Sequence, residues 1–208
     1  EALRSGPATT LLFAADDWDK TSRVLGALRL HFGRELGLID EDTFTFLWVT
    51  DFPMFEWDED GGRWGAVHHP FTRPTDEWTE RFADEPGKAL AHAYDVVVNG
   101  NELGGGSFRI HEPELQAKVL DLLSLSPAEQ RAKFGFLLDA LAMCAPPMGG
   151  IAFGIDRMTM VLAGEPNLRD VIAFPKNQAG VDPMSGAPSD VTPEQLAELG
   201  IRLAEQED

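Results

Sequence analysis

Arg157 stands three residues after Gly154, within the run Gly149–Met160, and this spacing is suited to the binding of an anion. We expect a strand to end at the glycine and a helix to begin there, because the first N–H groups and positive dipole end of such a helix would then point at the anion. Glycine allows a ligand close to the backbone, and a guanidinium offers a fork of donors that suits phosphate. The alternative is a plain strand–helix junction with a surface arginine.

Two carboxylates, Asp95 and Glu102, flank the pair Asn99–Gly100 in segments that otherwise have the composition of buried strands. Asn-Gly is a strong short-range signal for a β-hairpin. A buried carboxylate needs a cation or a metal ion as its partner, and Mg²⁺ held between carboxylates and phosphate oxygens meets that need. Solvated acids at the edge of a strand are the alternative.

Arg109 lies beyond three consecutive glycines, Gly104–Gly106, on the second strand of this hairpin. A regular strand would place Glu102 and Arg109 on opposite faces, because they are seven residues apart. If both serve one site, a bulge must intervene, and we expect it at the glycines. Three glycines also fit a place where a flat ligand lies against the backbone. The rigid fork of Arg109 suits a carboxylate, although pairing with a surface acid is the alternative.

The adjacent residues His68 and His69 lie in a segment, Trp64 to Asp84, that we expect to be a long loop. Side chains of neighbouring residues in an extended chain point apart, so the pair does not form a two-ligand metal site by itself. Long ordered loops in compact domains are usually functional, and loops often carry substrate contacts. A structural role for each histidine is the alternative.

Composition sets bounds on the kind of protein. The 208 residues suffice for one domain with a small appendage, and the net charge of −18 argues against broad nucleic-acid binding by this part. No apolar run is long enough for a membrane helix, and the first residues do not resemble a signal peptide, so we expect a cytoplasmic location. The single cysteine, Cys144, excludes an internal disulfide and is expected to fill space rather than to act as a nucleophile. The chain does not begin with methionine, which is consistent with a piece of a longer protein.

Strands grouped around hairpins, with helices between them, predict an α+β fold with a mostly antiparallel sheet flanked by helices. Ser126 and Thr192 are the expected caps of two of the helices. The expected strands are 10–14, 44–52, the two sides of Asn99–Gly100, 150–153 and 171–175. One helix is expected to end near residue 38. The other expected helices span 113–123, 127–142, 156–162 and 193–199.

Five motifs in the same order resemble those of bacterial-type aspartyl-tRNA synthetases, which are class II aminoacyl-tRNA synthetases. They are DFPMFEW, VHHPFT, AYDVVVNGNELGGGSFRIH, AMCAPPMGGIAFGIDRMTMVL and LRDVIAFPK, and the resemblance runs from about Leu11 to Leu203. It implies part of the class II catalytic core, with residues 39–208 as the C-terminal part of the catalytic domain and residues 1–38 as the tail of an insertion domain.

The resemblance also implies an activity and its site. L-aspartate would be activated with ATP and Mg²⁺ to aspartyl-adenylate and transferred to tRNA(Asp), and tRNA(Asn) stays open as a second acceptor. The family's roles fall on nine residues: Asp95 and Glu102 as metal contacts, Glu102, Gly154, Ile155, Asp156 and Arg157 at ATP, with Glu102 and Arg157 as catalytic, and His68, Arg109 and His69 at aspartate.

This sequence departs from the family's pattern at one position, and some of the family's features lie outside the matching region. The family's motif 1, its motif 2 and its anticodon-binding domain lie upstream of the matching region, so we expect this chain to be inactive alone and the full-length protein to be a homodimer. Met148 stands where the family usually has histidine. Asparaginyl- and lysyl-tRNA synthetases, an amidating paralogue and a non-catalytic binding module are the alternatives. The retained Glu102, Arg109 and Arg157 favour an enzyme, and the HHPF loop with Arg109 favours aspartate.

Overall fold

The computed structural model describes residues 9–40 and 42–204. The chain divides into two compact units, residues 1–45 and 46–208, and each is considered by itself. The division falls at Thr45, a few residues beyond the boundary expected at residue 38. The assignment of the first segment to an insertion domain stays a prediction, and its residues 1–8 lie outside the described residues.

Helix α1 (Trp18–Glu35) is the main element of the first unit. Asp17 caps it by accepting a hydrogen bond from the Lys20 N–H. None of its described side chains is buried. The strand expected at residues 10–14 is wrong, because these residues are irregular. A strand needs an edge to pair with, which propensity alone does not supply.

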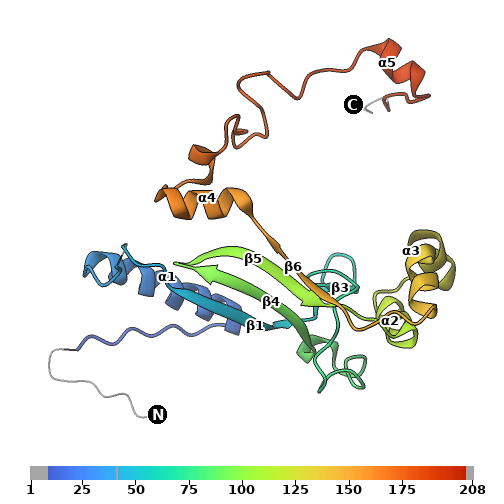
Figure 1. The fold of residues 1–208 in the computed structure, drawn as a ribbon, viewed down its shortest axis with the longest axis horizontal. Coiled ribbons are helices and arrows are strands. Elements are labelled where there is room, and N and C mark those ends of the chain that lie inside the picture. Colours follow the sequence, from blue (N-terminus) through green and yellow to red (C-terminus); the bar gives the residue numbers. More distant parts are fainter. Residues whose placement is uncertain (1–8, 41, 205–208) are drawn as a thin grey trace. The chain divides into compact units, whose positions relative to one another are not determined.

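The second unit is built on a four-stranded antiparallel sheet in the order β1-β4-β5-β6 (Figure 1). These strands span Phe46–Pro53, Leu90–Val98, Asn101–Phe108 and Gly149–Phe153. The hairpin between β4 and β5 turns at Asn99 and Gly100, whose φ values of 48° and 81° are both positive. Two positive φ values are what a two-residue hairpin turn requires, so the Asn-Gly prediction is confirmed. The predicted α+β fold is confirmed as well.

A small second sheet contradicts part of the predicted loop. Strands β2 (Phe55–Asp58) and β3 (Arg63–Ala66) form an antiparallel hairpin, so residues 64–66 belong to a strand. Trp57 and Trp64 pair across it with their ring centroids 5.3 Å apart. The turn between the strands was expected, but two four-residue strands give too short an alternation to stand out in the sequence. After β3, the chain is mostly loop as far as the short 3₁₀ helix η1 (Pro86–Lys88).

Four helices and one further 3₁₀ helix occupy the rest of the second unit. They are α2 (Pro113–Leu122), α3 (Pro127–Ala142), α4 (Ile155–Ala163), η2 (Leu168–Val171) and α5 (Pro193–Glu198). Ser126 and Thr192 each form a capping box, as expected. On α3, Leu141 is buried, whereas Phe134, Leu137 and Leu138 are partly buried. The strand expected at 171–175 is wrong, because η2 occupies its start and no strand follows.

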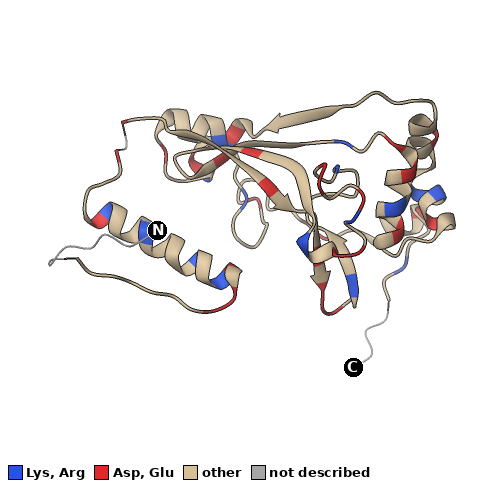
Figure 2. Cartoon of the chain, turned by 90° about the horizontal axis from the view of Figure 1, so that it is seen from below, with Lys and Arg blue, Asp and Glu red and all other residues tan. Residues whose placement is uncertain are grey.

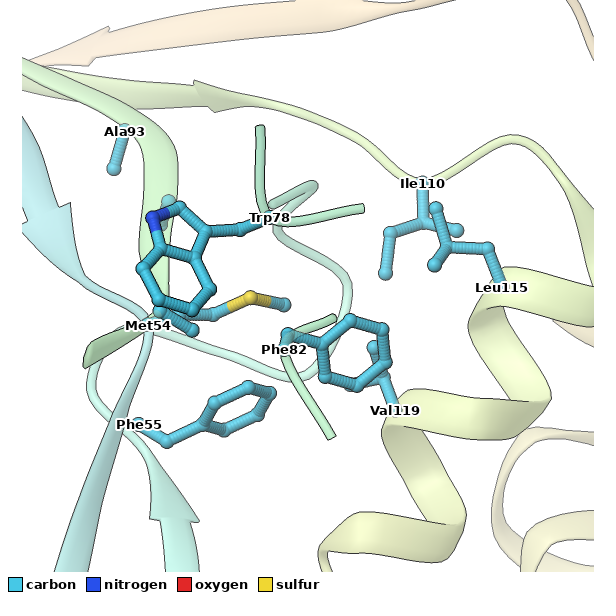
Figure 3. Close-up of a cluster of buried hydrophobic side chains, with 10 residues drawn as sticks. Met54, Phe55, Trp78, Phe82, Ala93, Ile110, Leu115 and Val119 are labelled. Atoms are coloured by element: carbon cyan, nitrogen blue, oxygen red, sulfur yellow. The ribbon is translucent and has the colours of Figure 1, made fainter. Parts of the chain in front are cut away.

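The core lies on one face of the main sheet (Figure 3). Ala91 and Ala93 of β4 are on this face, and the loop after β3 covers them with Trp78 and Phe82. Asp95 is the next residue of β4 on the same face, because side chains alternate along a strand. The face therefore passes from a covered apolar core to an acidic region. The full cluster is Met54, Phe55, Trp78, Phe82, Ala89, Ala91, Ala93, Ile110, Leu115 and Val119.

Charged residues are spread over the described loops, helices and strands (Figure 2). Helix α1 carries Lys20, Arg23, Arg29 and Arg34 between Asp19 and Glu35, and α2 and α3 also carry residues of both signs. None of the described helices combines the length and the apolarity that crossing a bilayer requires.

Candidate functional site

A β-bulge brings the expected site residues of β5 to one face of the sheet. Val97 of β4 pairs with Glu102 and Val96 pairs with Gly104, so Leu103 is an extra residue without a partner in β4. The bulge that strand parity required is therefore present, one residue before the glycines rather than within them. As a result, Glu102 shares its face with Gly105, Ser107 and Arg109.

Asp95 and Glu102 lie next to each other on this face. Gly105 pairs with Asp95, and a Cβ atom at Gly105 would overlap the Asp95 carboxylate and lie 3.5 Å from Glu102 Oε1. Burial raises the pKa of the Asp95 carboxyl, the Glu102 charge raises it further, and the nearby His68 partly opposes this. Two carboxylates that disfavour each other's charge form a place that a cation would stabilise.

The three glycines serve different purposes. A Cβ at Gly104 would overlap the Phe153 ring and the Ala152 carbonyl, and a Cβ at Gly106 would overlap the Gly150 carbonyl. These two glycines therefore allow β6 to pack closely against β5. Of the three, Gly105 lies on the acidic face, and its missing side chain leaves room for the Asp95 carboxylate rather than for a ligand.

Arg157 extends from the first turn of α4 to the acidic end of β5. Its Nη1 donates to the Glu102 backbone carbonyl at 3.0 Å and lies 3.2 Å from Glu102 Oε2. The N–H of Gly154, the residue before α4, donates to the Leu103 carbonyl at 2.8 Å. The bulge residue therefore anchors the start of the helix. The N–H groups of Ile155 and Asp156 belong to the first turn, where an α-helix has no internal partners for them.

At the other end of the face, Arg109 contacts His69 of the histidine loop, which we define as residues 67–72. Arg109 Nη1 is 3.1 Å from Nδ1 of His69 and closer still to Nε2. Burial lowers the pKa of His69, and the charges of Arg109 and His68 lower it further. The imidazole is therefore held neutral, which leaves it able to accept a hydrogen bond from the guanidinium.

The backbone of Arg109 is fixed from both sides. Its N–H donates to the Met148 carbonyl at 2.8 Å, so the residue that departs from the family pattern contributes a backbone group here. On the other side Arg109 forms a β-bridge with Thr72 of the histidine loop. The Ile110 N–H donates to Phe71 O at 3.0 Å, and the Arg73 N–H donates to Phe108 O at 2.9 Å.

His68 and His69 diverge, as expected for neighbouring residues. His68 is exposed, stacks edge to face on Phe52 with ring centroids 4.9 Å apart, and lies near enough to Asp95 to lower its pKa. His68 thus lies between the acidic pair and the Arg109 end of the face. Arg109 contacts His69, whereas Arg157 contacts Glu102, so the expected site residues form two groups joined by one sheet face.

Buried polar residues that support the loop were missed by sequence analysis. Thr72 and Ser107 are each 2% exposed, and Gln116 of α2 is fully buried. The Gln116 amide donates to Pro70 O at 2.8 Å, which fastens the histidine loop to α2. The position of Gln116 between apolar Leu115 and Val119 was the available signal, because a polar residue on the core side of a helix must have a partner.

A metal site made by protein groups alone is not present among the described residues, where no group of three or more potential ligands occurs. Asp95 and Glu102 provide two carboxylates, and burial together with the Glu102 charge raises the pKa of Asp95. Mg²⁺ typically takes one or two carboxylates and completes its shell with water and phosphate. The residues present therefore fit a magnesium ion shared with a nucleotide.

Comparison with known proteins defines the class. The model of the family described as tRNA synthetases class II (D, K and N) matches residues 11–178. Among solved structures, aspartyl tRNA synthetase from Entamoeba histolytica covers 83% of this chain and 29% of its own, with a TM-score of 0.51 and 23% identity. Asparaginyl-tRNA synthetase from the same organism, in complex with asparaginyl-adenylate, gives a TM-score of 0.50 at 18% identity over 86% of this chain and 32% of its own. These likenesses show the fold of a class II aminoacyl-tRNA synthetase core.

The chain belongs to the class II tRNA synthetase family for D, K and N. Curated relatives include the aspartate–tRNA(Asp/Asn) ligase of Geotalea uraniireducens, 55% identical over 192 residues, which are 92% of this chain and 32% of that protein. The aspartate–tRNA ligase of Enterococcus faecalis is 55% identical over 191 residues, again 92% of this chain and 32% of the relative. The chain thus spans about a third of the length of the curated relatives it matches.

Proposed function

We propose that the protein to which this chain belongs is an ATP-dependent aspartate–tRNA ligase. The observation that carries the proposal is Arg109, whose backbone is bridged on both sides and whose guanidinium is fixed by His69 on the face that also holds the acidic pair. A fixed guanidinium fork is suited to a carboxylate rather than to the amide of asparagine or the ammonium of lysine. Relatives at 55% identity that are named aspartate–tRNA ligases support this choice.

In this proposal the α-carboxylate of aspartate attacks the α-phosphorus of ATP and pyrophosphate leaves. Arg109 binds the side-chain carboxylate, and His68 is a further contact to the amino acid, with His69 as support. Arg157 turns from Glu102 to the γ-phosphate, and backbone groups of 154–156 line the nucleotide. Such a reaction depends on positioning and on charge stabilisation, and needs no covalent nucleophile.

Asp95 and Glu102 would hold Mg²⁺ in this proposal. When bound, the ion would neutralise phosphate charge and align the nucleotide oxygens. The protein's own part is to place two carboxylates beside Gly105, where the missing side chain leaves room for them. The aspartyl group would then pass to the terminal ribose of tRNA(Asp), with tRNA(Asn) as a second acceptor to be tested, in a cytoplasmic homodimer.

ATP–pyrophosphate exchange by the full-length protein tests the proposal. We expect exchange that depends on L-aspartate and Mg²⁺, and at most weak exchange with L-asparagine or L-lysine. Exchange with another amino acid would reassign the substrate, and no exchange with any amino acid would favour a non-catalytic binding module. Aminoacylation of separate tRNA(Asp) and tRNA(Asn) transcripts then decides the acceptor, and light scattering on the same sample decides the oligomeric state.

A further inference from the structure

The histidine loop contains a buried hydroxyl that has no part in the reaction described above. Thr72 Oγ1 is 3.2 Å from Nδ1 of His69, and it donates to Ser107 Oγ over 3.5 Å. Thr72 and Ser107 are both almost inaccessible to solvent. Buried hydroxyls are costly unless they are hydrogen-bonded, so the two hydroxyls and the imidazole must be considered together.

His69 is approached by two groups that can only donate. The Phe71 N–H lies 3.2 Å from Nδ1, and Arg109 Nη1 lies nearest to Nε2. A neutral imidazole carries a proton on one nitrogen and accepts a hydrogen bond at the other. It therefore cannot accept from the Phe71 N–H at Nδ1 and from Arg109 at Nε2 at the same time. One of the two must face a ring N–H.

Thr72 is the group near the ring that can either donate or accept. If Nε2 accepts from Arg109, Nδ1 carries the proton and needs an acceptor, which Thr72 Oγ1 provides at 3.2 Å. The Thr72 hydroxyl hydrogen is then free for Ser107, in the direction that the geometry gives. If Nδ1 instead accepts from Phe71, the Nε2–H points at the guanidinium. A charged guanidinium that faces a ring N–H loses a stronger hydrogen bond than the neutral Phe71 amide does in the first arrangement, so the first arrangement is favoured.

We propose that Thr72 is a positioning residue for amino-acid recognition. Its hydroxyl accepts the Nδ1 proton of His69, so that Nε2 presents a lone pair to Arg109 and holds the guanidinium in place for the substrate carboxylate. Ser107 completes the relay by accepting from Thr72. This inference rests on the proposed role of Arg109, and it adds two residues outside direct substrate contact to the determinants of specificity.

Exchange kinetics of the full-length protein test the relay. Thr72→Val removes the hydroxyl with little change of shape, and we expect the KM for aspartate to rise about tenfold, the size of effect of one lost hydrogen bond. The kcat and the KM for ATP should each change by less than about twofold, because the nucleotide end of the site is untouched. Thr72→Ser keeps the hydroxyl and should restore most of the affinity, and Ser107→Ala should give a smaller loss in the same direction.

Thr79→Val is the matched control, because Thr79 lies farther along the same connection and its hydroxyl donates to the Thr75 carbonyl at 3.2 Å. It should leave the KM for aspartate unchanged. An unchanged KM in Thr72→Val would overturn the proposal. Equal rises in the KM for aspartate and for ATP would also overturn it, since that pattern indicates a general loss of structure.

The tautomer of His69 gives a second measurement that does not depend on activity. In full-length protein with ¹³C- and ¹⁵N-labelled histidine, the His69 signal is assigned by its loss in His69→Gln. We expect the Nδ1–H tautomer in the wild type and a shift to the Nε2–H tautomer in Thr72→Val. A wild-type protein in the Nε2–H form would overturn the role of Thr72. Failure of exchange with every amino acid would overturn only the proposed function, because the tautomer still tests the relay.

Discussion

The two ends of strand β5 present charged groups that are held in different ways. At the Arg109 end, backbone bridges, an imidazole and buried hydroxyls fix a single cation. At the Glu102 end, the ion pair with Arg157 is about half exposed, with side chains 49% and 47% accessible, and Asp95 has a raised pKa beside it. The first end is assembled before any ligand arrives, whereas the second has an imbalance of charge that a cation and a phosphate would relieve.

This difference matches the two tasks that the proposed reaction would require. Discrimination among amino acids benefits from a rigid group whose orientation is already determined, because a mismatched side chain then leaves it unpaired. Nucleotide and metal exchange in every cycle, so an exposed and replaceable ion pair suits that end. An exposed pair of this kind contributes little to stability, and its loss should therefore affect binding more than folding.

The largest effect is expected at the rigid end. Arg109→Ala should lower kcat/KM for aspartate on the order of a thousandfold, because it removes a charged pair to the substrate. ATP binding, measured by calorimetry on the full-length protein, should be nearly unchanged. Arg81→Ala is the control, since Arg81 stacks on the Trp78 ring and pairs with Glu77 rather than with a residue of the expected site. Equal loss of ATP and aspartate binding would remove the contrast between the two ends.

Glu102→Gln should break the exchangeable end. We expect exchange to fall about a hundredfold and the Mg²⁺ concentration for half-maximal activity to rise, because a carboxylate ligand and the Arg157 partner are both lost. The KM for aspartate should change much less. Titration of exchange activity with Mg²⁺ measures this, and an unchanged Mg²⁺ requirement would show that the acids serve another purpose.

Gly105→Ala and Gly106→Ala form a matched pair that separates site from fold. The new Cβ at Gly106 would overlap the backbone carbonyl of Gly150, so β5 and β6 must move apart, at a cost of about 1–3 kcal/mol in the free energy of unfolding. The new Cβ at Gly105 would meet only the carboxylate end of Asp95, which can rotate, so stability should change little while Mg²⁺ binds more weakly. Chemical denaturation with and without Mg²⁺ measures both, and the same loss for the two variants would contradict the assignment of their faces.

The smallest effect is a dependence of aspartate binding on pH. The pKa of His69 lies below its ordinary value of 6.5, so the neutral ring contributes stability that is present above pH 6.5 and is lost as the pH falls from there toward the lowered pKa. Protonation also places a second cation beside Arg109. We expect the KM for aspartate to rise a few-fold on acidification through this range, and His69→Gln to remove that change. If His69→Gln shows the same dependence of the KM for aspartate on pH, a group other than His69 is responsible for it.

Local signals in the sequence predicted the elements that short-range chemistry determines. Asn99 and Gly100 predicted the hairpin, Ser126 and Thr192 predicted helix caps, and strand parity predicted a bulge between Glu102 and Arg109. The bulge falls on Leu103 because the glycines on either side of Gly105 are needed to admit β6. That requirement comes from a neighbouring strand, so it could not be predicted from the hairpin alone.

Long-range pairing explains what could not be predicted. Residues 10–14 and 171–175 have the composition of strands, yet they form none. Thr72 and Ser107 are 35 residues apart, and nothing in either segment shows that their hydroxyls meet. The motifs predicted that Arg109 and Glu102 belong to one site, and this stays a prediction, but the contrast in how they are held comes only from their packing.

The crystal structure of the full-length protein with a non-hydrolysable aspartyl-adenylate analogue tests most directly whether the two ends of β5 have separate roles. We expect the aspartyl carboxylate about 3 Å from the guanidinium of Arg109 and the adenylate phosphate toward the acidic end, with His69 and Thr72 unmoved. An analogue bound with its carboxylate at Arg157, or on the opposite face of the sheet beside Tyr94 and Phe108, would contradict the account.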